Sequence, residues 1–526
     1  MRNVWLIARV IIVASIILVL ISSFLHYSDI LLIYDDAYIF FRYAKNYANG
    51  YGLVYNIGER VEGYTSFLWV YLLGLGYKYL RIEPVNLSVV LGVLSYMLIL
   101  GILYRFSDKF ITHKSNFILI PILLYAADGS FTRYVFSGMD TLLFVALFLI
   151  AIYVLIFIRH PLQVAIAFFF LALSRPEGLA YLGLGLIFVL VSEKNKYDGL
   201  KRVFQIIAIF FALYAPYFIW RYVYYGYLLP NTYYAKASAL SLMKAKRGFE
   251  LLVQVISWTN FWLYAILSVF LIIKKRSSDI YLFFLILLCF SIVYFVIIGG
   301  DFIVWFGPRF LMPILPLLYL LSSIFLFELY KSIRLFIGRG LILGITIFII
   351  ILRLSSYPNS IDLSGYKSQM NSWIHLAIYI RDHTPEDILL ATDAAGIIPY
   401  YSGRSSIDMF GLTDAHIAHL PLDKRSIGVV AHEKFSPMYI ISREPDCIVS
   451  TWINEEGIPI SAGLEKLRDE ISKSYHLVAV AKVRFGAPDN GKWVIPVNNY
   501  SKKLYDRGYQ TGLFCKAGVI RSKTNH

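Results

Sequence analysis

The sequence predicts a polytopic α-helical membrane protein with a C-terminal soluble α/β domain. Two observations predict the membrane part: 58% of the residues are hydrophobic and only 16% are charged, and many apolar runs approach the roughly 20 residues needed to cross a bilayer. The third observation is a change of composition after Leu354, where charge density becomes ordinary and membrane-length runs end. We therefore expect a membrane domain over residues 1–354 and an α/β domain over residues 355–526.

The apolar runs predict about eleven crossings. The first run, 4–25, follows a short basic leader without a small-residue cleavage site, which predicts an anchoring helix rather than a removed signal peptide. Residues 67–80 are too few for an ordinary span and predict an interfacial or re-entrant helix, so the second crossing is placed at 85–104. The remaining spans are expected near 115–128, 140–158, 161–174, 178–192, 203–220, 257–273, 280–298, 309–330 and 338–354.

Basic connectors predict the orientation of these spans. Arg2 places the N-terminus in the cytoplasm, because positively charged loops stay on that side. Further basic connectors follow every second span, at Arg159, Lys194–Arg202, Lys274–Arg276 and Lys331–Arg339. Five polar clusters and the C-terminal domain are then expected on the extracytoplasmic side of a cell membrane. These clusters are Asp35-Asp36, Ser137–Asp140, Ser174–Gly178, Tyr224–Lys236, and Gly299–Asp301 with Arg309.

Residues 35–66 form the strongest candidate for a catalytic site. Two adjacent carboxylates, Asp35 and Asp36, follow the first span and open an amphipathic helical pattern, and Glu59, Glu62 and Tyr64 stand in a Gly-rich return. Acidic side chains at a membrane edge are costly unless they bind something, so they indicate a functional site. The alternative is a solvated loop with a surface helix.

Several cations are expected on the outer face, against the usual charge bias. They are Arg133, Arg175, Arg221, Lys236 and Arg309. A guanidinium fork matches phosphate oxygens bidentately, so the set as a whole predicts an anionic lipid headgroup. Each cation taken singly could instead belong to an ion pair such as Arg175–Glu177. The net charge of +15 accordingly points to cytoplasmic loops and lipid phosphates before nucleic acid.

The C-terminal part has the pattern of a small α/β domain. Helices are expected at 373–381 and 464–474, and buried strands at 388–392 and 447–450. Asp393 follows the first strand, where carboxylates can line a ligand cleft or simply build a turn. A Cys447–Cys515 disulfide is possible in an oxidising compartment. We find no Walker loop, dinucleotide fingerprint, zinc-ligand spacing or nucleophile elbow.

The motifs together resemble a known family over nearly the whole chain. They are DDAYIFFRYAKNYANGYGLVYNIGERVEGYTSFLW, SGMDT, SRPEG, YYG…PNTYYAK, GGD…PRF and DAAGIIPYYSGRSSIDMFGLTDAHIAH. This set resembles the GT-C superfamily of membrane glycosyltransferases, and within it the branch of the terminal β-(1→2)-arabinofuranosyltransferases. Met139 and Asp140 stand where Leu and Glu are common in that pattern. The resemblance implies an enzyme that takes a sugar from a polyprenyl-phosphate carrier, with its catalytic acid in the first outer loop.

The expected reaction is transfer with inversion of a pentose such as arabinofuranose, or of a hexose, to an extracytoplasmic glycan, glycolipid or glycoprotein. Such a transfer needs one carboxylate to take the proton of the acceptor hydroxyl and positive charge to stabilise the leaving phosphate. We predict Asp35 as the base, with Asp36 orienting it or, together with Asp35, holding a divalent cation such as Mg²⁺, Mn²⁺ or Ca²⁺. The predicted phosphate contacts are Arg309, Arg175, Lys236 and Arg42. The predicted substrate contacts are Glu59, Glu62, Tyr64, Asp140, Glu177, Asn231, Asp301 and Asp393.

Two other classes of protein are considered. A transporter or flippase for a lipid-linked or anionic substrate would place its polar groups near mid-bilayer and often carries internal repeats, whereas here no repeat is found and the acids cluster at one face. A non-catalytic envelope assembly protein could have an outer domain but would not require the paired acids.

Overall fold

The structure is a computed structural model of the whole chain. It describes residues 33–113, 115–237, 242–301, 307–333, 335–355, 363–421, 434–483, 492–497 and 500–520, with six isolated residues between 13 and 25. The expected first span at 4–25 and the basic residues Arg2 and Arg334 lie outside the described part of the chain.

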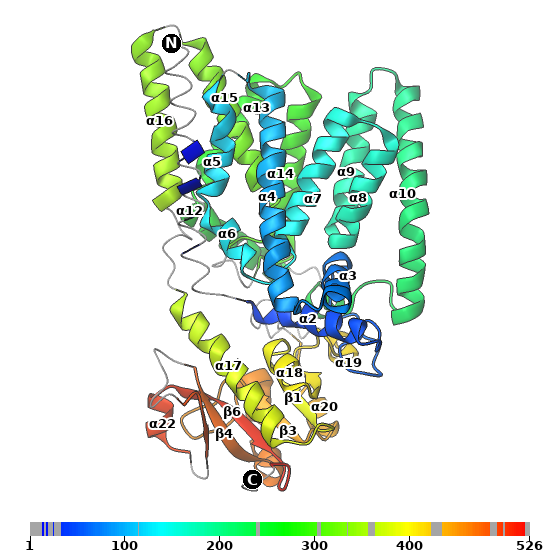
Figure 1. Cartoon of the computed structure of the whole chain (residues 1–526), viewed down its shortest axis with the longest axis vertical. Helices are drawn as coiled ribbons and strands as arrows, with labels where there is room; N and C mark the ends of the chain where they lie inside the picture. Colours follow the sequence, from blue (N-terminus) through cyan, green and yellow to red (C-terminus); the bar gives the residue numbers. More distant parts are fainter. Residues whose placement is uncertain are drawn as a thin grey trace.

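A bundle of roughly parallel and antiparallel helices forms the upper part of the molecule in Figure 1. Its helices follow the expected runs, except for the short α6, which was not expected. They are α4 (Pro84–Phe110), α5 (Ile120–Ala126), α6 (Gly129–Val135), α7 (Thr141–Tyr153), α8 (Pro161–Ser174), α9 (Glu177–Ser192), α10 (Lys196–Tyr225), α13 (Phe261–Lys274), α14 (Asp279–Ile297), α15 (Leu315–Ser332) and α16 (Phe336–Ser355). Their sequences are dominated by Leu, Ile and Phe, so they present apolar side chains both to the bundle interior and outwards.

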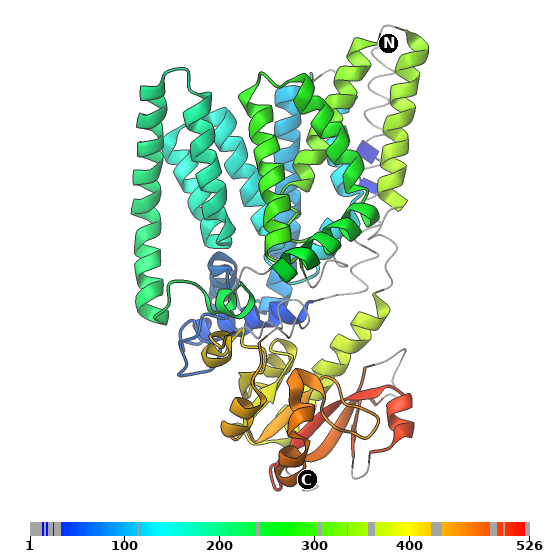
Figure 2. The same ribbon diagram turned by 180° about the vertical axis from the view of Figure 1, so that it is seen from behind.

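Six of the described helices are long and apolar enough to cross a membrane, or seven if one bent pair counts as a span. The bent pair consists of α12 (Leu242–Trp258) and α13, which meet at an angle of 89°. Figure 2 shows α12, in green, lying across the base of the bundle. The other expected spans, near 115–128, 161–174 and 178–192, are shorter apolar helices. The chain is therefore a multi-pass membrane protein, as the sequence predicts.

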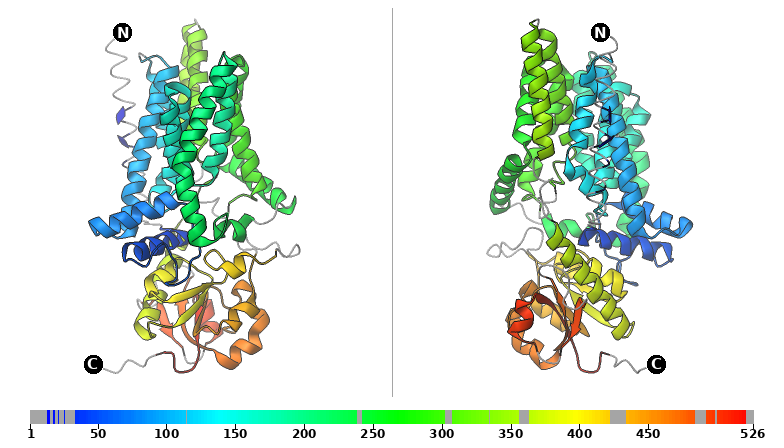
Figure 3. Two further views of the ribbon diagram at one scale, coloured as in Figure 1. Left: turned by 90° about the vertical axis from the view of Figure 1, so that its right-hand side faces the viewer. Right: turned by 60° about the vertical axis from the view of Figure 1, so that its left-hand side comes forward.

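The basic connectors gather at one end of the bundle. Arg159, after α7, forms an ion pair with Glu193, after α9, and Lys109 at the end of α4 lies over the ring of Phe157. At the same end, Phe110 packs against Tyr281 at the start of α14. The C-terminal residues lie beyond the opposite end (Figure 3). The bundle therefore separates its basic loops from its C-terminal domain.

Two short helices lie between the bundle and the C-terminal residues. Helix α2 (Asp35–Ala48) crosses the base of the bundle, and α3 (Phe67–Leu75) continues through a π-helical turn, Gly76–Leu80 (Figure 1). The buried face of α2 includes Tyr38, Phe41 and Ala44, as its periodicity predicts. The 67–80 segment thus lies at the base of the bundle and does not run its length.

The C-terminal domain, from α17 to β6, contains a six-stranded mixed sheet in the order β2-β1-β3-β6-β4-β5. Strand β1 pairs in parallel with β2 and β3, and the other pairings are antiparallel. The elements are α17 (Ser364–His383), β1 (Leu389–Thr392), α18 (Ile397–Ser402), β2 (Ser405–Asp408), α19 (Ala415–Ala418), α20 (Pro437–Ser442), β3 (Cys447–Ser450), η4 (Ser461–Leu467), α21 (Arg468–Ser474), β4 (His476–Lys482), β5 (Val494–Pro496), α22 (Lys502–Asp506) and β6 (Tyr509–Cys515).

Cys447 and Cys515 stand opposite each other on β3 and β6 and form a disulfide. The bridge therefore links the parallel half of the sheet to its antiparallel half. The helix expected at 464–474 is instead divided between η4 and α21.

Candidate active site

A cavity of about 990 Å³ lies where the bundle, α2 and the C-terminal domain meet. All five polar clusters expected on one face contribute side chains to it. The sequence-predicted site residues that line the cavity are Asp35, Asp36, Tyr64, Asp140, Arg175, Glu177, Lys236, Asp301, Arg309 and Asp393. Side chains more than 300 residues apart in the chain are thus brought to one site.

The carboxylate of Asp35 is held by the C-terminal domain. The backbone N–H of Gly396 donates to Oδ2 at 3.1 Å, and the N–H of Ile397 donates to Oδ1 at 2.8 Å. Asp35 also lies in the first turn of α2, where a carboxylate is favoured by the helix dipole. Both oxygens of the predicted base therefore have a fixed orientation.

Gly396 is required by the closeness of this contact. A Cβ atom placed on Gly396 would lie 1.8 Å from the backbone oxygen of Asp35 and 2.8 Å from its carboxyl carbon. No side chain fits in that space without moving one of the two segments. The turn between β1 and α18 is thus shaped to approach Asp35.

The surroundings of Asp35 favour a proton on its carboxyl group. Burial is the main cause, and the neighbouring Asp36 and Asp393 add to it, while the N–H donors of Ile397 and Gly396 act in the opposite direction. The net result raises the pKa of Asp35 to about 7. A carboxyl group with this pKa can accept a proton and release it near neutral pH, as a general base must.

Asp36 has a cationic partner in the cavity, since its Oδ2 lies 3.8 Å from the Nζ of Lys236 on α11 (Asn231–Ala237). Among the described residues, no group of three or more His, Cys, Asp or Glu side chains is arranged to hold a metal ion. Asp35 is already bonded by two amides and Asp36 faces an ammonium group, so these residues do not make a ready set of metal ligands. The divalent cation remains a prediction, and we derive no chemical step through it.

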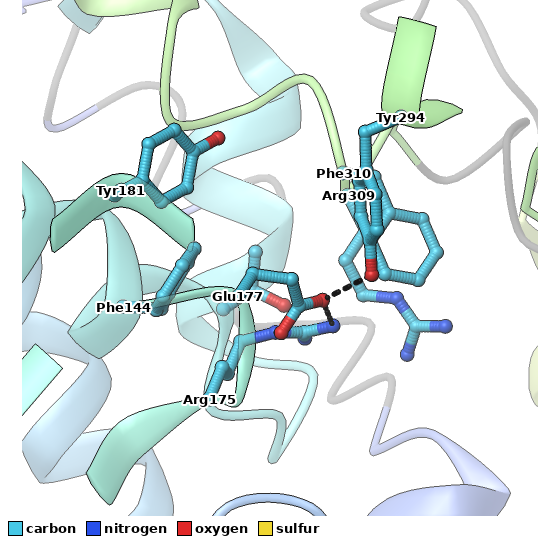
Figure 4. A pocket seen from close by; sticks show the side chains of 8 residues that line it. Phe144, Arg175, Glu177, Tyr181, Tyr294, Arg309 and Phe310 are labelled. Carbon is cyan, nitrogen blue, oxygen red and sulfur yellow. Dashed lines mark hydrogen bonds and ion pairs between the residues drawn. The ribbon is translucent and has the colours of Figure 1, made fainter. Parts of the chain in front are cut away.

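Arg175 is the centre of an ion-pair network on the bundle side of the cavity. Its guanidinium pairs with Glu177 at 2.9 Å and with Asp140 at 3.6 Å, and Glu177 also accepts a hydrogen bond from Tyr294 at 3.0 Å (Figure 4). Asp140 in turn accepts a hydrogen bond from Ser66. These contacts fix the guanidinium in position while one face of the network borders the cavity.

Arg309 is the cation best placed to bind a further anion. Its Nη2 pairs with Asp301 at 3.1 Å, but its Nε is buried without a hydrogen-bond acceptor among the described residues. In Figure 4 its guanidinium points away from Glu177 and Tyr294. A buried unpaired donor on a cationic side chain is costly, and a phosphate oxygen would satisfy it.

Four predicted site residues do not line this cavity. The guanidinium of Arg42 donates to the carbonyls of Tyr55, Pro399 and Arg404, so it joins the first loop to the C-terminal domain instead of reaching a phosphate. Glu59 accepts from Asn56 near the surface.

The other two residues outside the cavity are also engaged elsewhere. Glu62 is buried in an ion pair with Arg221 at 2.7 Å, which accounts for one of the outer-face cations. The side-chain amide of Asn231 donates to the carbonyls of Gly411 and Leu412. Their positions correct the predicted substrate contacts: both residues hold the walls of the site together.

The structure also adds cavity residues that the sequence analysis missed. Arg247 on α12 lines the cavity, and its Nε donates to the carbonyl of Gly299 at 3.3 Å. It lies in a segment expected on the outer face, so the charge argument applied to Arg309 could have found it. The aromatic residues Tyr366, Trp373, Phe410 and Trp452 also line the cavity, but no spacing signal marks them.

Comparison with known proteins gives a family match, a relative of known activity and solved structures of similar fold. Residues 359–501 match the family described as Domain of unknown function (DUF8728). The chain is 32% identical over 226 residues to the terminal beta-(1->2)-arabinofuranosyltransferase of Mycobacterium tuberculosis (strain ATCC 25618 / H37Rv). That alignment covers 39% of this chain and 35% of the relative, so it spans about a third of the relative's length.

The fold can be compared over almost the entire chain. The crystal structure of ArnT from Cupriavidus metallidurans bound to undecaprenyl phosphate matches with a TM-score of 0.57 at 12% identity, over 98% of this chain and 99% of that chain. The apo structure of the same protein matches with a TM-score of 0.52. The chain therefore has the GT-C membrane fold of ArnT, and the resemblance drawn from its motifs is confirmed.

Proposed function

We propose that this protein is an inverting membrane glycosyltransferase that moves a sugar from a polyprenyl-phosphate donor to a glycan, glycolipid or glycoprotein acceptor. The observation that carries the proposal is that one cavity is lined both by Asp35 and Asp36 and by Lys236, Arg175, Arg247 and Arg309. The fold supports it, because the ArnT structure with the same fold holds undecaprenyl phosphate.

In the proposed reaction Asp35 is the general base. The acceptor hydroxyl attacks the anomeric carbon, a new carbon–oxygen bond forms, and the hydroxyl proton passes to Asp35. The bond between the anomeric carbon and the phosphate oxygen breaks, and its electron pair leaves with the polyprenyl phosphate. A single displacement of this kind inverts the anomeric centre.

The side of the cavity formed by the helix bundle, here called the bundle wall, carries cations that would stabilise the leaving phosphate. Arg309 offers a buried N–H that has no acceptor among the residues the structure describes, and Arg175 is held in place by Glu177 and Asp140. Fixed donors of this kind stabilise charge that develops during the reaction without having to reorganise. Lys236 and Arg247 extend the same positive side of the cavity.

A pentose such as arabinofuranose is the first sugar to test, because the relative from Mycobacterium tuberculosis is an arabinofuranosyltransferase. Purified protein would be incubated with polyprenyl-phosphate donors radiolabelled in arabinofuranose or in a hexose, together with an envelope glycan extract. We expect label from the pentose donor to enter the glycan fraction. If label stays on the lipid for every donor, this function is contradicted.

The Arg309→Ala variant should bind the donor more weakly. Loss of a hydrogen bond between a guanidinium and a phosphate costs about 1.5–3 kcal/mol, so donor affinity should fall by about 10- to 150-fold. Binding of undecaprenyl phosphate to the solubilised protein measures this. Arg381→Ala is a matched control, because Arg381 is an exposed arginine whose side chain pairs only with its neighbour Asp382 among the described residues. Unchanged donor affinity in Arg309→Ala would make Arg309 a structural residue.

The cavity and the C-terminal domain are proposed to be extracytoplasmic. Basic connectors gather at the opposite end of the bundle, and the Cys447–Cys515 disulfide is typical of an oxidising compartment. In a Cys289→Ser background, Ser472→Cys on α21 should react with a membrane-impermeant maleimide in intact cells. Ser277→Cys, in the basic connector between α13 and α14, should react only after permeabilisation. The reverse pattern would contradict the orientation.

A further inference from the structure

Three parallel strands of the C-terminal domain end at the edge of the sheet that borders the cavity. Because β1 pairs in parallel with both β2 and β3, the carboxyl ends of all three lie together. The residues that follow these ends line the cavity: Asp393 after β1, Phe410 after β2, and Thr451 and Trp452 after β3. Ligands of α/β sheets commonly bind at this edge, so the sheet presents a binding wall to Asp35.

This wall differs in chemistry from the bundle wall opposite. The side chains that the C-terminal domain contributes to the cavity include Trp373, Asp393, Phe410, Thr451, Trp452 and Ser461. They supply aromatic rings, hydroxyls and a carboxylate, and none of the described residues of this domain that line the cavity is Lys or Arg. Aromatic faces beside hydroxyl and carboxylate groups suit a neutral, hydroxyl-rich ligand, whereas phosphate and carboxylate ligands would be favoured at the bundle wall.

Trp452 is the exposed platform of this wall, with 43% of its surface accessible. Its backbone is fixed from three directions. The N–H donates to the hydroxyl of Ser461 at 3.1 Å, and the carbonyl accepts from the hydroxyl of Ser450 at 2.6 Å and from the N–H of Ile460 at 3.1 Å. An exposed indole on a fixed backbone can stack on a flat ligand ring at a low entropic cost.

Asp393 links this platform to the predicted base. Its carboxylate accepts hydrogen bonds from the Thr451 hydroxyl at 2.6 Å and from the Thr451 N–H at 3.1 Å. Asp393 also lies near enough to Asp35 for its charge to act on that carboxyl group. A ligand stacked on Trp452 and bonded to Asp393 would therefore have a hydroxyl group close to Asp35.

We propose that the C-terminal domain carries the acceptor subsite, in which a neutral oligosaccharide stacks a sugar ring on Trp452 and bonds its hydroxyls to Asp393. This inference rests on the proposed function, and it gives a role to the domain of unknown function matched over residues 359–501. Donor and acceptor would then approach Asp35 from opposite walls of one cavity.

The test measures binding of two soluble probes, an arabinofuranose hexasaccharide and maltohexaose, to the full-length protein in lipid nanodiscs. We expect saturable binding of at least one probe, and a loss of about tenfold in its affinity for Trp452→Ala. Trp452→Phe keeps a ring and should recover most of the affinity. Trp493→Ala is the matched control, because Trp493 is a tryptophan of the same domain that stacks on His375 and does not line the cavity.

The outcomes separate this inference from the proposed function. Undecaprenyl phosphate binding is measured on the same samples, and it should be unchanged in Trp452→Ala. Equal oligosaccharide affinity in wild type and Trp452→Ala, or no saturable binding of either probe by the wild type, would overturn the acceptor subsite while leaving the donor function intact. Displacement of the bound probe by a phospholipid acyl chain would assign the wall to lipid instead. If the wild type does not bind undecaprenyl phosphate, the proposed glycosyltransferase function is contradicted.

Discussion

Asp35→Asn should leave a folded protein that binds undecaprenyl phosphate but turns over about 100- to 10,000-fold more slowly. Asparagine keeps the size of the side chain but cannot take a proton from the acceptor. The N–H groups of Gly396 and Ile397 donate to different oxygens of Asp35, so the single carbonyl oxygen of asparagine keeps one of these two hydrogen bonds. Initial rates of sugar transfer at saturating donor measure the effect.

Asp36→Asn is the matched control for that variant. Its carboxylate faces Lys236 at 3.8 Å and makes no contact with the β1–α18 turn among the described contacts, so the loss of rate should be smaller. If Asp36→Asn is inactive and Asp35→Asn is nearly normal, the base is the other member of the pair. Near-normal rates in both variants would remove this loop from the chemistry.

The wild-type rate should also fall as the pH is lowered through about 7. The raised pKa of Asp35 means that its base form is half populated at that pH, and only the ionised carboxylate can accept the proton. The effect of pH on the stability of the fold has the opposite direction to its effect on the rate. Because the folded state holds this proton more tightly than the unfolded state does, the contribution of Asp35 to stability decreases as pH rises from about 4 to about 7.

Gly396→Ala is expected to have the second largest effect. The added methyl group would lie 1.8 Å from the backbone oxygen of Asp35, so either α2 or the β1–α18 turn must move by more than an ångström. A displacement of about 1 Å at a catalytic group costs roughly 100-fold in rate. The transfer rate should therefore fall steeply while donor binding, which uses the opposite wall, changes little.

The control for Gly396→Ala is Gly365→Ala in the first turn of α17, where an added Cβ meets nothing within 4 Å. The two variants make the same chemical change in the same domain. Comparison of their thermal unfolding shows whether the domain remains folded. A wild-type rate in folded Gly396→Ala would show that the C-terminal domain does not position Asp35.

The elements that were predictable are those with a local signal. The apolar runs gave the positions of the bundle helices, and the amphipathic run after Asp36 gave α2. Strands β1 and β3 are short buried runs bounded by turns, and both were predicted. Strands β2, β4, β5 and β6 were not predicted, because β-propensity is a weak signal that depends on the position a strand takes in its sheet.

The sequence predicts which side of the membrane domain carries the site, but not which residues contact one another there. The charge bias of the loops placed Asp35, Arg175, Arg309 and Lys236 on one side, and the cavity brings them together. Nothing local distinguishes these cations from Arg42, which is much closer to Asp35 in sequence but binds backbone carbonyls. The contact of Gly396 with Asp35 joins residues 361 positions apart and depends on the packing of two domains.

One measurement tests the central claim most directly. Wild-type protein and Asp35→Asn are each given polyprenyl-phosphate arabinofuranose and a glycan acceptor, and the release of polyprenyl phosphate is followed by mass spectrometry. We expect the wild type to form equal amounts of free polyprenyl phosphate and of glycan extended by one sugar. Asp35→Asn should bind the donor and form neither product at a comparable rate. Extended glycan formed equally fast by both proteins, or none formed by the wild type, would contradict the proposal.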